Sequence, residues 1–499
     1  MRPILFGLAL ALVLTASAHA DPVSAKIDAG VLTGEARNGV AVYRNIPFAA
    51  APVGRLRWAP PTPAQPWSGA RDATKAGPSC PQPMNADGSP NGGGANGPMS
   101  EDCLQLNVFA PAKAKAAPVM VWIHGGSHRT GAGWVYDGTN FARDGVILVS
   151  INYRLGPLGY FAHPALTKAA KPGEPVGNYG LMDQIAALKW VQGNIKAFGG
   201  DPKNVTVFGE SAGGMSTLAI LAVPSTKGLY QKAIVESGLG WFEPTPLSKI
   251  EAQGVTLLDK IGLTTATVEH MRAIPAEDLI VKLNGNFGPF VDGRLLKETP
   301  TQAFAAGRAV DVPLIIGSNS GEDSLMGAWN PNMAALIPVA ARAIYVEEAA
   351  ISDEALGRAI FTDRVMGAPA RWVANQAARG KPAWLYYFSY VGSRFRPMMT
   401  RSFHAAEIQY VFEYWGRRTP MSMVSQDDKA MATLMHSCWI AFAKTSQPTC
   451  ASGPAWPAYD NKRDQLMEFG ATSGVRTNFR KSRMDAQEAA TLSSLALPH

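Results

Sequence analysis

Short apolar runs recur along the chain and predict buried strands. The six clearest are Val119–Ile123, Val146–Tyr153, Val205–Phe208, Ala233–Val235, Leu314–Ile316 and Trp384–Tyr390. The segments between them have helical patterns, and within Leu181–Phe198 the apolar side chains recur at spacings of three and four, as on one helix face. Strands that alternate with helices predict an α/β fold with a mostly parallel central sheet flanked by helices.

Two longer segments, at about 240–305 and 330–380, have mostly helical and polar patterns. We interpret them as helical cap insertions over the sheet, because neither reads as a separate domain and the chain contains no internal repeat. The sequence therefore predicts a single domain over residues 21–499.

The first twenty residues have the pattern of a targeting segment. Arg2 is followed by the 13-residue apolar run Ile4–Ala16, and then by the small-x-small site Ala18-His19-Ala20. A membrane span needs about 20 apolar residues, so this run is too short for one. We expect a signal peptide over residues 1–20 and export to the periplasm or the medium, without stable membrane insertion after cleavage. The alternative is an uncleaved anchor.

The composition narrows the class of protein further. Hydrophobic residues make up 46% of the chain and charged residues 17%, which excludes a disordered or coiled-coil protein. The formal net charge of +7 is small for 499 residues, and no run of four or more Lys or Arg occurs. We therefore expect no nucleic-acid partner.

The four cysteines are expected to form disulfides, since an exported chain meets an oxidising compartment. Proximity favours Cys80–Cys103 and Cys438–Cys450, with free buried thiols as the alternative. The first pair would close a loop that contains the glycine-rich segment 91–98. No CxxC or HxxxH spacing occurs, so the sequence predicts no metal site.

A nucleophile candidate follows the third predicted strand. The run Gly209-Glu210-Ser211-Ala212-Gly213-Gly214 stands between strand Val205–Phe208 and the helical pattern Met215–Ala222. A sharp strand-to-helix turn strains the backbone at the serine, and glycine neighbours let chain and substrate approach it. We predict that Ser211 is the nucleophile, against the alternative of an ordinary turn serine.

An activated serine needs a histidine base and a carboxylate that orients it, in the chain order serine, acid, histidine. Of the histidines after Ser211, only His404, His436 and the C-terminal His499 lie far enough downstream. His404 follows a strand and a polar loop, so it is the predicted base, whereas His436 lies in the helical pattern Met431–Phe442. The acid is Glu322 or Asp323, which follow strand Leu314–Ile316, and residue-level reasoning does not separate them.

Backbone N–H groups are also needed to stabilise a developing oxyanion. The run His124-Gly125-Gly126-Ser127, directly after strand Val119–Ile123, offers them together with the N–H of Ala212. We interpret His124 as a structural residue beside this loop.

Several motifs together resemble the type-B carboxylesterase/lipase family, which includes cholinesterases and bacterial para-nitrobenzyl esterases. They are Phe198–Pro202 leading to Gly209–Gly213, Glu101–Val108, Asn152–Gly156 and Gly177–Gln184. Gln105 departs from the second of these motifs, where an aromatic residue is usual. The resemblance covers most of the chain and implies an α/β-hydrolase fold. It also implies that Glu322, and not its neighbour Asp323, is the catalytic acid, with His404 as the base.

The resemblance implies a disulfide and an ion pair, and the sequence departs from the family pattern at two further places. Cys80–Cys103 matches a disulfide at the lip of the family's active-site gorge, and Arg57 and Glu101 match a structural ion pair. Ser127 stands where a third glycine is common. The loop between the two cysteines lacks Phe, Trp and Tyr, whereas cholinesterases place an aromatic ring there against the quaternary ammonium of the substrate. Choline esters are therefore not the expected substrates.

These observations predict an exported serine hydrolase that cleaves carboxylic esters of small molecules through an acyl-enzyme. Ser211 attacks, His404 transfers protons and Glu322 orients the imidazole. The predicted oxyanion donors are Gly126, Ser127 and Ala212. No cofactor is expected, and the oligomeric state stays open. The alternatives are an amide, carbamate or lipid-ester hydrolase with the same triad, and a non-catalytic cholinesterase-like binding protein.

Overall fold

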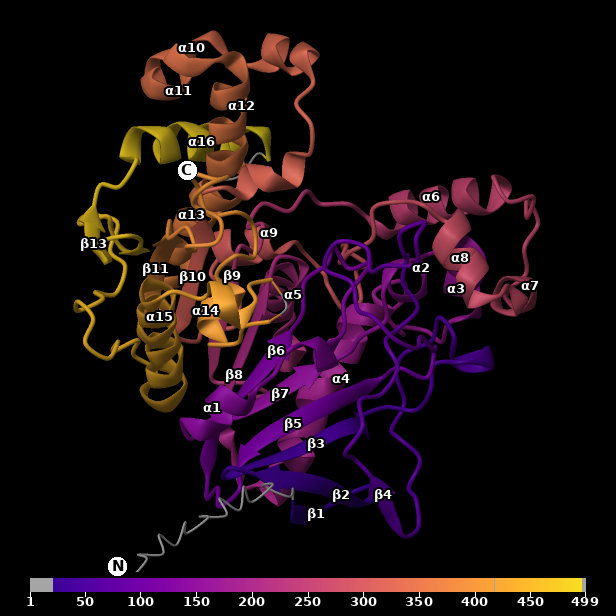
Figure 1. Cartoon of the computed structure of the whole chain (residues 1–499). Helices are drawn as coiled ribbons and strands as arrows, with labels where there is room; N and C mark the ends of the chain where they lie inside the picture. Colours follow the sequence, from indigo (N-terminus) through magenta and orange to yellow (C-terminus); the bar gives the residue numbers. More distant parts are fainter. Residues whose placement is uncertain (1–20, 417, 496–499) are drawn as a thin grey trace, which may run out of the picture.

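The computed structural model describes residues 21–416 and 418–495 (Figure 1). The predicted signal peptide, residues 1–20, lies outside the described residues, as does His499. Within the part of the chain that is described, no helix is long and apolar enough to cross a membrane.

One sheet of 13 strands organises the described residues. Its path is β1-β2-β3-β5-β7-β6-β8-β9-β10-β11-β12-β13, with β4 paired to β2. The bounds are β1 Asp21–Ile27, β2 Gly30–Arg37, β3 Val40–Pro47, β4 Ala70–Asp72, β5 Gln105–Pro111, β6 Ala117–Ile123, β7 Ile147–Ile151, β8 Gly200–Glu210, β9 Lys232–Glu236, β10 Leu314–Asn319, β11 Ala383–Phe388, β12 Gln465–Phe469 and β13 Gly474–Thr477. Along this path the neighbouring strands from β7 through β12 are parallel, whereas those at the two ends are antiparallel; β4 pairs parallel to β2.

All six predicted strands are present, and they form the parallel centre of the sheet as β6 to β11. Their side chains are buried on both faces, which is why each reads as a continuous apolar run. The prediction of a mostly parallel sheet is confirmed.

Helices cover both faces of this sheet and bury two apolar clusters against it. The bounds outside the insertions are α1 Thr139–Arg143, α2 Gly156–Gly159, α3 Pro164–Ala169, α4 Tyr179–Asn194, α5 Ala212–Leu221, α14 Ile408–Val411, α15 Gln426–Thr445 and α16 Lys481–Ser494. The helix predicted over Leu181–Phe198 is α4 followed by the 3-10 turn Ile195–Phe198. Gly199 ends that turn in the left-handed conformation, with φ of 79°.

The two predicted insertions are helical, as the polar patterns indicated. The first holds α6 Leu247–Asp259, α7 Val268–Ala273, α8 Ala276–Lys282 and α9 Pro300–Ala305, and the second holds α10 Val339–Ile344, α11 Val346–Ile351, α12 Asp353–Thr362 and α13 Ala368–Ala377. Figure 1 shows α6–α8 as a group at the upper right and α10–α12 as a second group at the top, with α16 beside it. Because α6–α8 pack with residues of α2, α3 and α4 in a separate apolar cluster, they extend the core beyond the sheet.

Two disulfides join the pairs that proximity favoured, Cys80–Cys103 and Cys438–Cys450. The Arg57 guanidinium contacts both carboxylate oxygens of Glu101, with Nε 2.7 Å from Oε2. This ion pair adjoins the Cys80–Cys103 bridge, since all four residues border the same small internal cavity. The base of the glycine-rich loop is therefore held by a covalent bond and by a charge pair.

Candidate active site

Ser211 occupies a sharp turn between β8 and α5. Its φ of 56° and ψ of −122° are strained for a residue with a side chain. The glycines around it are sterically required, because a Cβ on Gly213 would lie 1.9 Å from the carbonyl oxygen of Ile123, and one on Gly209 would lie 2.5 Å from the same atom. The turn therefore presents the serine at the carboxyl end of the parallel strands, and Ser211 lines a cavity there.

His404 and Glu322 meet beside this turn. Nδ1 of His404 lies 2.5 Å from Oε2 of Glu322, which is fully buried. The other oxygen of Glu322 accepts hydrogen bonds from the Ser237 hydroxyl at 2.6 Å and from the Asn319 backbone N–H at 2.7 Å. The carboxylate is thus fixed from both sides, and it faces the imidazole with one defined oxygen.

Asp323, the other acid candidate, is turned away from the imidazole. Its carboxylate pairs with Arg401 at 2.9 Å and with Arg358 at 3.6 Å, and it accepts a hydrogen bond from Thr362. The geometry therefore separates the two adjacent carboxylates, one facing His404 and the other committed to a structural ion-pair network.

Glu210 lies on the opposite side of the imidazole. Its Oε1 is 3.1 Å from Nε2 of His404, although the angles are not those of a hydrogen bond. Nε2 also has no hydrogen bond to the Ser211 hydroxyl among the described residues. The imidazole is therefore held between two carboxylates, at the wall of the cavity that Ser211 shares.

The charges in this region perturb one another strongly. Burial opposes a charge on His404, but the attraction of Glu210 and then of Glu322 outweighs it and raises the pKa to about 9. Burial raises the pKa of Glu210 to about 7. Burial, followed by repulsion from Glu210, raises the pKa of the nearby Glu407 to about 8. The site thus favours a protonated imidazole near neutral pH.

The loop after β6 supplies the backbone of the opposite wall. Gly126 has φ of 101° and Ser127 has φ of 56°, so Ser127 adopts the left-handed conformation that a glycine would take there. A Cβ on Gly125 would lie 2.7 Å from Oε2 of Glu210, which explains why that position is glycine. Among the described residues, no hydrogen bond uses the N–H of Gly126, Ser127 or Ala212. These N–H groups stand at the same end of β6 and β8 as Ser211.

The cavity itself has a volume of about 250 Å³. It is lined by Gly92, Gly93, Gly125, Gly126, Ser127, Val135, Tyr136, Glu210, Ser211, Leu325, His404, Ala405, Ile408, Gln409, Phe412, Tyr414 and Arg418. Gly92 and Gly93 come from the loop closed by Cys80–Cys103, so this loop borders the mouth of the site. Ala212 does not line the cavity, because it is buried behind Ser211.

The remaining buried histidines are structural. His124 stacks on Tyr153, with ring centroids 4.5 Å apart. His128 contacts the Ser216 hydroxyl at 3.0 Å, and burial lowers its pKa to about 3, so its imidazole is neutral. His436 packs in α15, with Nδ1 2.6 Å from the carbonyl oxygen of Val411.

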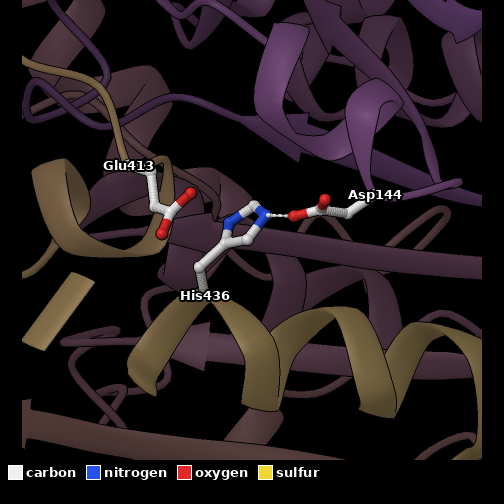
Figure 2. A group of neighbouring side chains, drawn as sticks. All are labelled: Asp144, Glu413 and His436. Atoms are coloured by element: carbon white, nitrogen blue, oxygen red, sulfur yellow. Dashed lines mark hydrogen bonds and ion pairs between the residues drawn. The ribbon is translucent and has the colours of Figure 1, made fainter. Parts of the chain in front are cut away.

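A second cluster has the residue types of a metal site. Asp144, Glu413 and His436 bring ligand atoms within 4.8 Å of one another, and Figure 2 shows the imidazole between the two carboxylates. The Arg143 guanidinium, however, contacts Asp144 Oδ2 and Glu413 Oε2, both at 2.6 Å. Despite burial, Arg143 and His436 hold the pKa of Asp144 below its usual range. A cation of the protein already neutralises these acids, and the cluster ties α1 to α15.

The sequence interpretation missed three residues that contact the candidate triad, two through their side chains and Asn319 through its backbone N–H. Glu210 is the variable position of the serine motif, where no pattern demanded a carboxylate. Ser237 and Asn319 follow or end strands β9 and β10, so a search of strand ends for polar residues would have found them. Ser211, Glu322, His404, Gly126 and Ser127 are brought together at one edge of the sheet.

Comparison with known proteins gives consistent relatives over most of the chain. The sequence profile of the carboxylesterase family matches residues 21–344 and 346–487. A para-nitrobenzyl esterase of Bacillus subtilis is 37% identical over 472 residues, which cover 88% of this chain and 93% of that protein. A fumonisin B1 esterase of Sphingopyxis macrogoltabida is 33% identical over 506 residues, or 93% of this chain and 91% of that one.

Solved structures of the same kind superpose closely. A PNB esterase has a TM-score of 0.80 at 32% identity, with 92% of this chain and 99% of that one covered. A carboxylesterase of Geobacillus stearothermophilus has a TM-score of 0.79 at 34% identity, with 93% and 99% covered. The predicted α/β-hydrolase fold and the family resemblance are confirmed. With the family profile matching nearly all of the described residues, the chain belongs to the carboxylesterase family and is a carboxylic-ester hydrolase.

Proposed function

We propose that the chain hydrolyses esters through an acyl-enzyme formed on Ser211, with His404 as the proton carrier and Glu322 as the acid that orients it. One observation carries the proposal: the buried Glu322–His404 contact of 2.5 Å stands beside a strained serine that lines the same cavity. Such a constellation serves nucleophilic catalysis and has no use in packing alone.

In the proposed mechanism, Ser211 Oγ forms a bond to the ester carbonyl carbon while Nε2 of His404 takes the hydroxyl proton. The negative charge on the carbonyl oxygen is stabilised by N–H groups of Gly126, Ser127 and Ala212. The bond to the alcohol oxygen then breaks, and the imidazolium donates its proton to that oxygen. Water repeats both steps on the acyl-enzyme, which releases the carboxylic acid and restores the serine.

The contacts around Glu322 support its role in positioning. Because the Ser237 hydroxyl and the Asn319 N–H occupy one oxygen, only the other can face the imidazole. That arrangement fixes the proton on Nδ1 and leaves Nε2 for the serine. The left-handed backbone of Ser127 supports the inclusion of its N–H in the oxyanion hole.

For the substrate, we propose small esters rather than lipid aggregates, amides or carbamates. The relatives named above are a para-nitrobenzyl esterase and a fumonisin B1 esterase, so both are named for the hydrolysis of esters. A cavity of about 250 Å³ is suited to the acyl and alcohol groups of a small ester.

We also propose export directed by residues 1–20, and one catalytic domain over residues 21–499. The two disulfides support the first proposal, because such bonds persist in oxidising compartments. The proposal of a single domain is supported by the cavity wall, which includes residues from the loop at Gly126 to His404. A domain boundary between these positions would divide the site.

The central test is the Ser211→Ala variant, assayed with para-nitrophenyl acetate and with a fluorophosphonate probe. We expect hydrolysis and covalent labelling to disappear while the circular dichroism spectrum stays unchanged. Ser68→Ala, at an exposed serine, is the matched control and should keep full activity. Turnover by the Ser211→Ala variant would contradict the proposal, and a wild-type protein that neither turns over esters nor reacts with the probe would favour the non-catalytic alternative.

A further inference from the structure

The candidate cavity is lined by a positively charged side chain, Arg418, that the proposed mechanism does not use. Ile408, Phe412 and Leu325 are apolar parts of the cavity wall, whereas Glu210 and Gln409 are polar lining residues. Arg418 is partly buried. Its Nη1 donates to the carbonyl oxygen of Ala405 at 2.7 Å, which places the guanidinium directly beside the residue that follows His404.

Contacts on several sides hold this arginine in place. The centre of its guanidinium lies 5.4 Å from the centroid of the Phe403 ring, a cation–π distance. Its own carbonyl oxygen accepts a hydrogen bond from Arg394. The neighbouring Thr419 donates to Gln409 at 2.9 Å, which anchors the loop to another residue of the cavity wall. The side chain is therefore positioned before any substrate arrives.

Three other arginines of this region contact a carboxylate, whereas Arg418 does not. Arg358 and Arg401 pair with Asp323, and Arg396 lies 3.5 Å from Asp427. Among the ion pairs of residues 21–416 and 418–495, none involves Arg418 at a distance of 4.0 Å or less. A guanidinium has five N–H donors, and the Ala405 carbonyl uses one of its nitrogens.

The nearest acid of the cavity does not fulfil the role of a partner. Glu210 feels the field of Arg418, but its carboxylate is the one that faces His404 at 3.1 Å. A partly buried guanidinium without a contacting carboxylate keeps N–H donors for a ligand that supplies the negative charge. The planar fork of an arginine fits a carboxylate with two parallel hydrogen bonds.

We propose that Arg418 is the binding site for a free carboxylate of the substrate, so that the favoured esters carry an anionic group near the ester bond. Half-esters of dicarboxylic acids and esters of hydroxy acids have this chemistry. The proposal rests on the proposed ester hydrolysis at Ser211 and adds the class of substrate to it.

The test compares charged and neutral esters of matched shape. On the alcohol side the pair is 4-acetoxybenzoate and methyl 4-acetoxybenzoate, and on the acyl side it is monomethyl adipate and dimethyl adipate. In Arg418→Gln we expect kcat/KM for at least one anionic ester to fall roughly 10- to 100-fold, mainly through KM, as for the loss of a charge-assisted pair. The neutral esters should change less than about twofold, and Arg418→Lys should lie between.

Two further measurements make the result decisive. Arg308→Gln removes an exposed arginine that pairs with Glu298, and it should leave the ratio of anionic to neutral kcat/KM unchanged. Calorimetric titration with adipate should give binding to the wild type and a loss in Arg418→Gln, without any need for turnover. An equal fall for anionic and neutral esters, or no selective fall on either side, would overturn the proposal. A wild type inactive on all four esters would contradict the hydrolysis at Ser211, while the titration would still decide the carboxylate site.

Discussion

Replacement of Glu210 by glutamine should shift the pH dependence of ester hydrolysis to lower pH. The serine can be activated only by a neutral imidazole, so activity rises as the pH passes the pKa of His404. Attraction by Glu210 is the largest of the effects that raise this pKa to about 9, against the opposing effect of burial. The isosteric amide keeps the shape of the site and removes that charge.

The distance gives the size of the effect. Glu210 Oε1 is 3.1 Å from Nε2 of His404, and an opposite charge this close favours the protonated form by about one to three pH units. Glu322, at 2.5 Å from Nδ1, stays in place and keeps part of the elevation. We therefore expect the pKa of the activity profile to fall by about one to two pH units in Glu210→Gln, which is about 1.4–2.7 kcal/mol.

The assay is kcat/KM for para-nitrophenyl acetate between pH 5.5 and 10, followed at a wavelength where the product absorbs equally in both ionisation states. Glu236→Gln is the control. Burial, and then repulsion from Glu407, raises the pKa of Glu236 well above its usual value, and the carboxylates that pair with His404 are those of Glu210 and Glu322. An unchanged profile in Glu210→Gln, or a wild-type profile that rises near pH 6.5, would refute the electrostatic reasoning.

Two further variants test the supports of the site. Ser237→Ala removes a 2.6 Å hydrogen bond to the buried acid and should lower kcat about tenfold with KM unchanged, in steady-state kinetics; equal losses in an exposed control such as Ser68→Ala would contradict a positioning role. Replacing Cys438 and Cys450 by serine opens a loop with a sequence separation of 12 and should destabilise the fold by about 3 kcal/mol, seen as a lower melting temperature with kcat retained. Under reducing conditions, which break both disulfides, the variant and the wild type should melt at the same temperature, and a lower value for the variant would contradict that explanation.

Continuous apolar runs in the sequence predicted the central strands of the sheet but not its outer strands. Strands β6 to β11 are buried on both faces, so each stands out as an apolar run. Strand β1 has only two buried positions among its seven residues, and its alternating pattern is too weak to separate it from a loop. Its pairing with β2 depends on register between strands, which a single run of residues does not contain.

The candidate site was predictable where the backbone demanded particular residues. The glycines beside Ser211 are needed for steric reasons, so the glycine-serine motif in the sequence predicts the strand-to-helix turn. The adjacent Glu322 and Asp323 have the same chemistry, and only the three-dimensional positions of Arg358 and Arg401 decide which of them is free to face His404. Residue-level patterns contain no such information, and the family resemblance supplied it instead.

Part of the backbone strain of the molecule lies at the cavity, and other residues with a positive φ lie elsewhere in the chain. Ser127, Ser211 and Ala405 have φ values of 56°, 56° and 63°, and all three line the cavity. Each of these φ values is unfavourable for a residue with a Cβ. The three residues lie in different parts of the candidate site: the oxyanion loop, the nucleophile turn and the position after His404. Such strain persists only where the surrounding structure fixes the backbone conformation. At the nucleophile turn the packing is this tight, because a Cβ on Gly213 would lie 1.9 Å from the carbonyl oxygen of Ile123. Substitutions that loosen those surroundings should therefore reduce activity before they reduce stability, because relaxation of the strain moves the reacting groups apart.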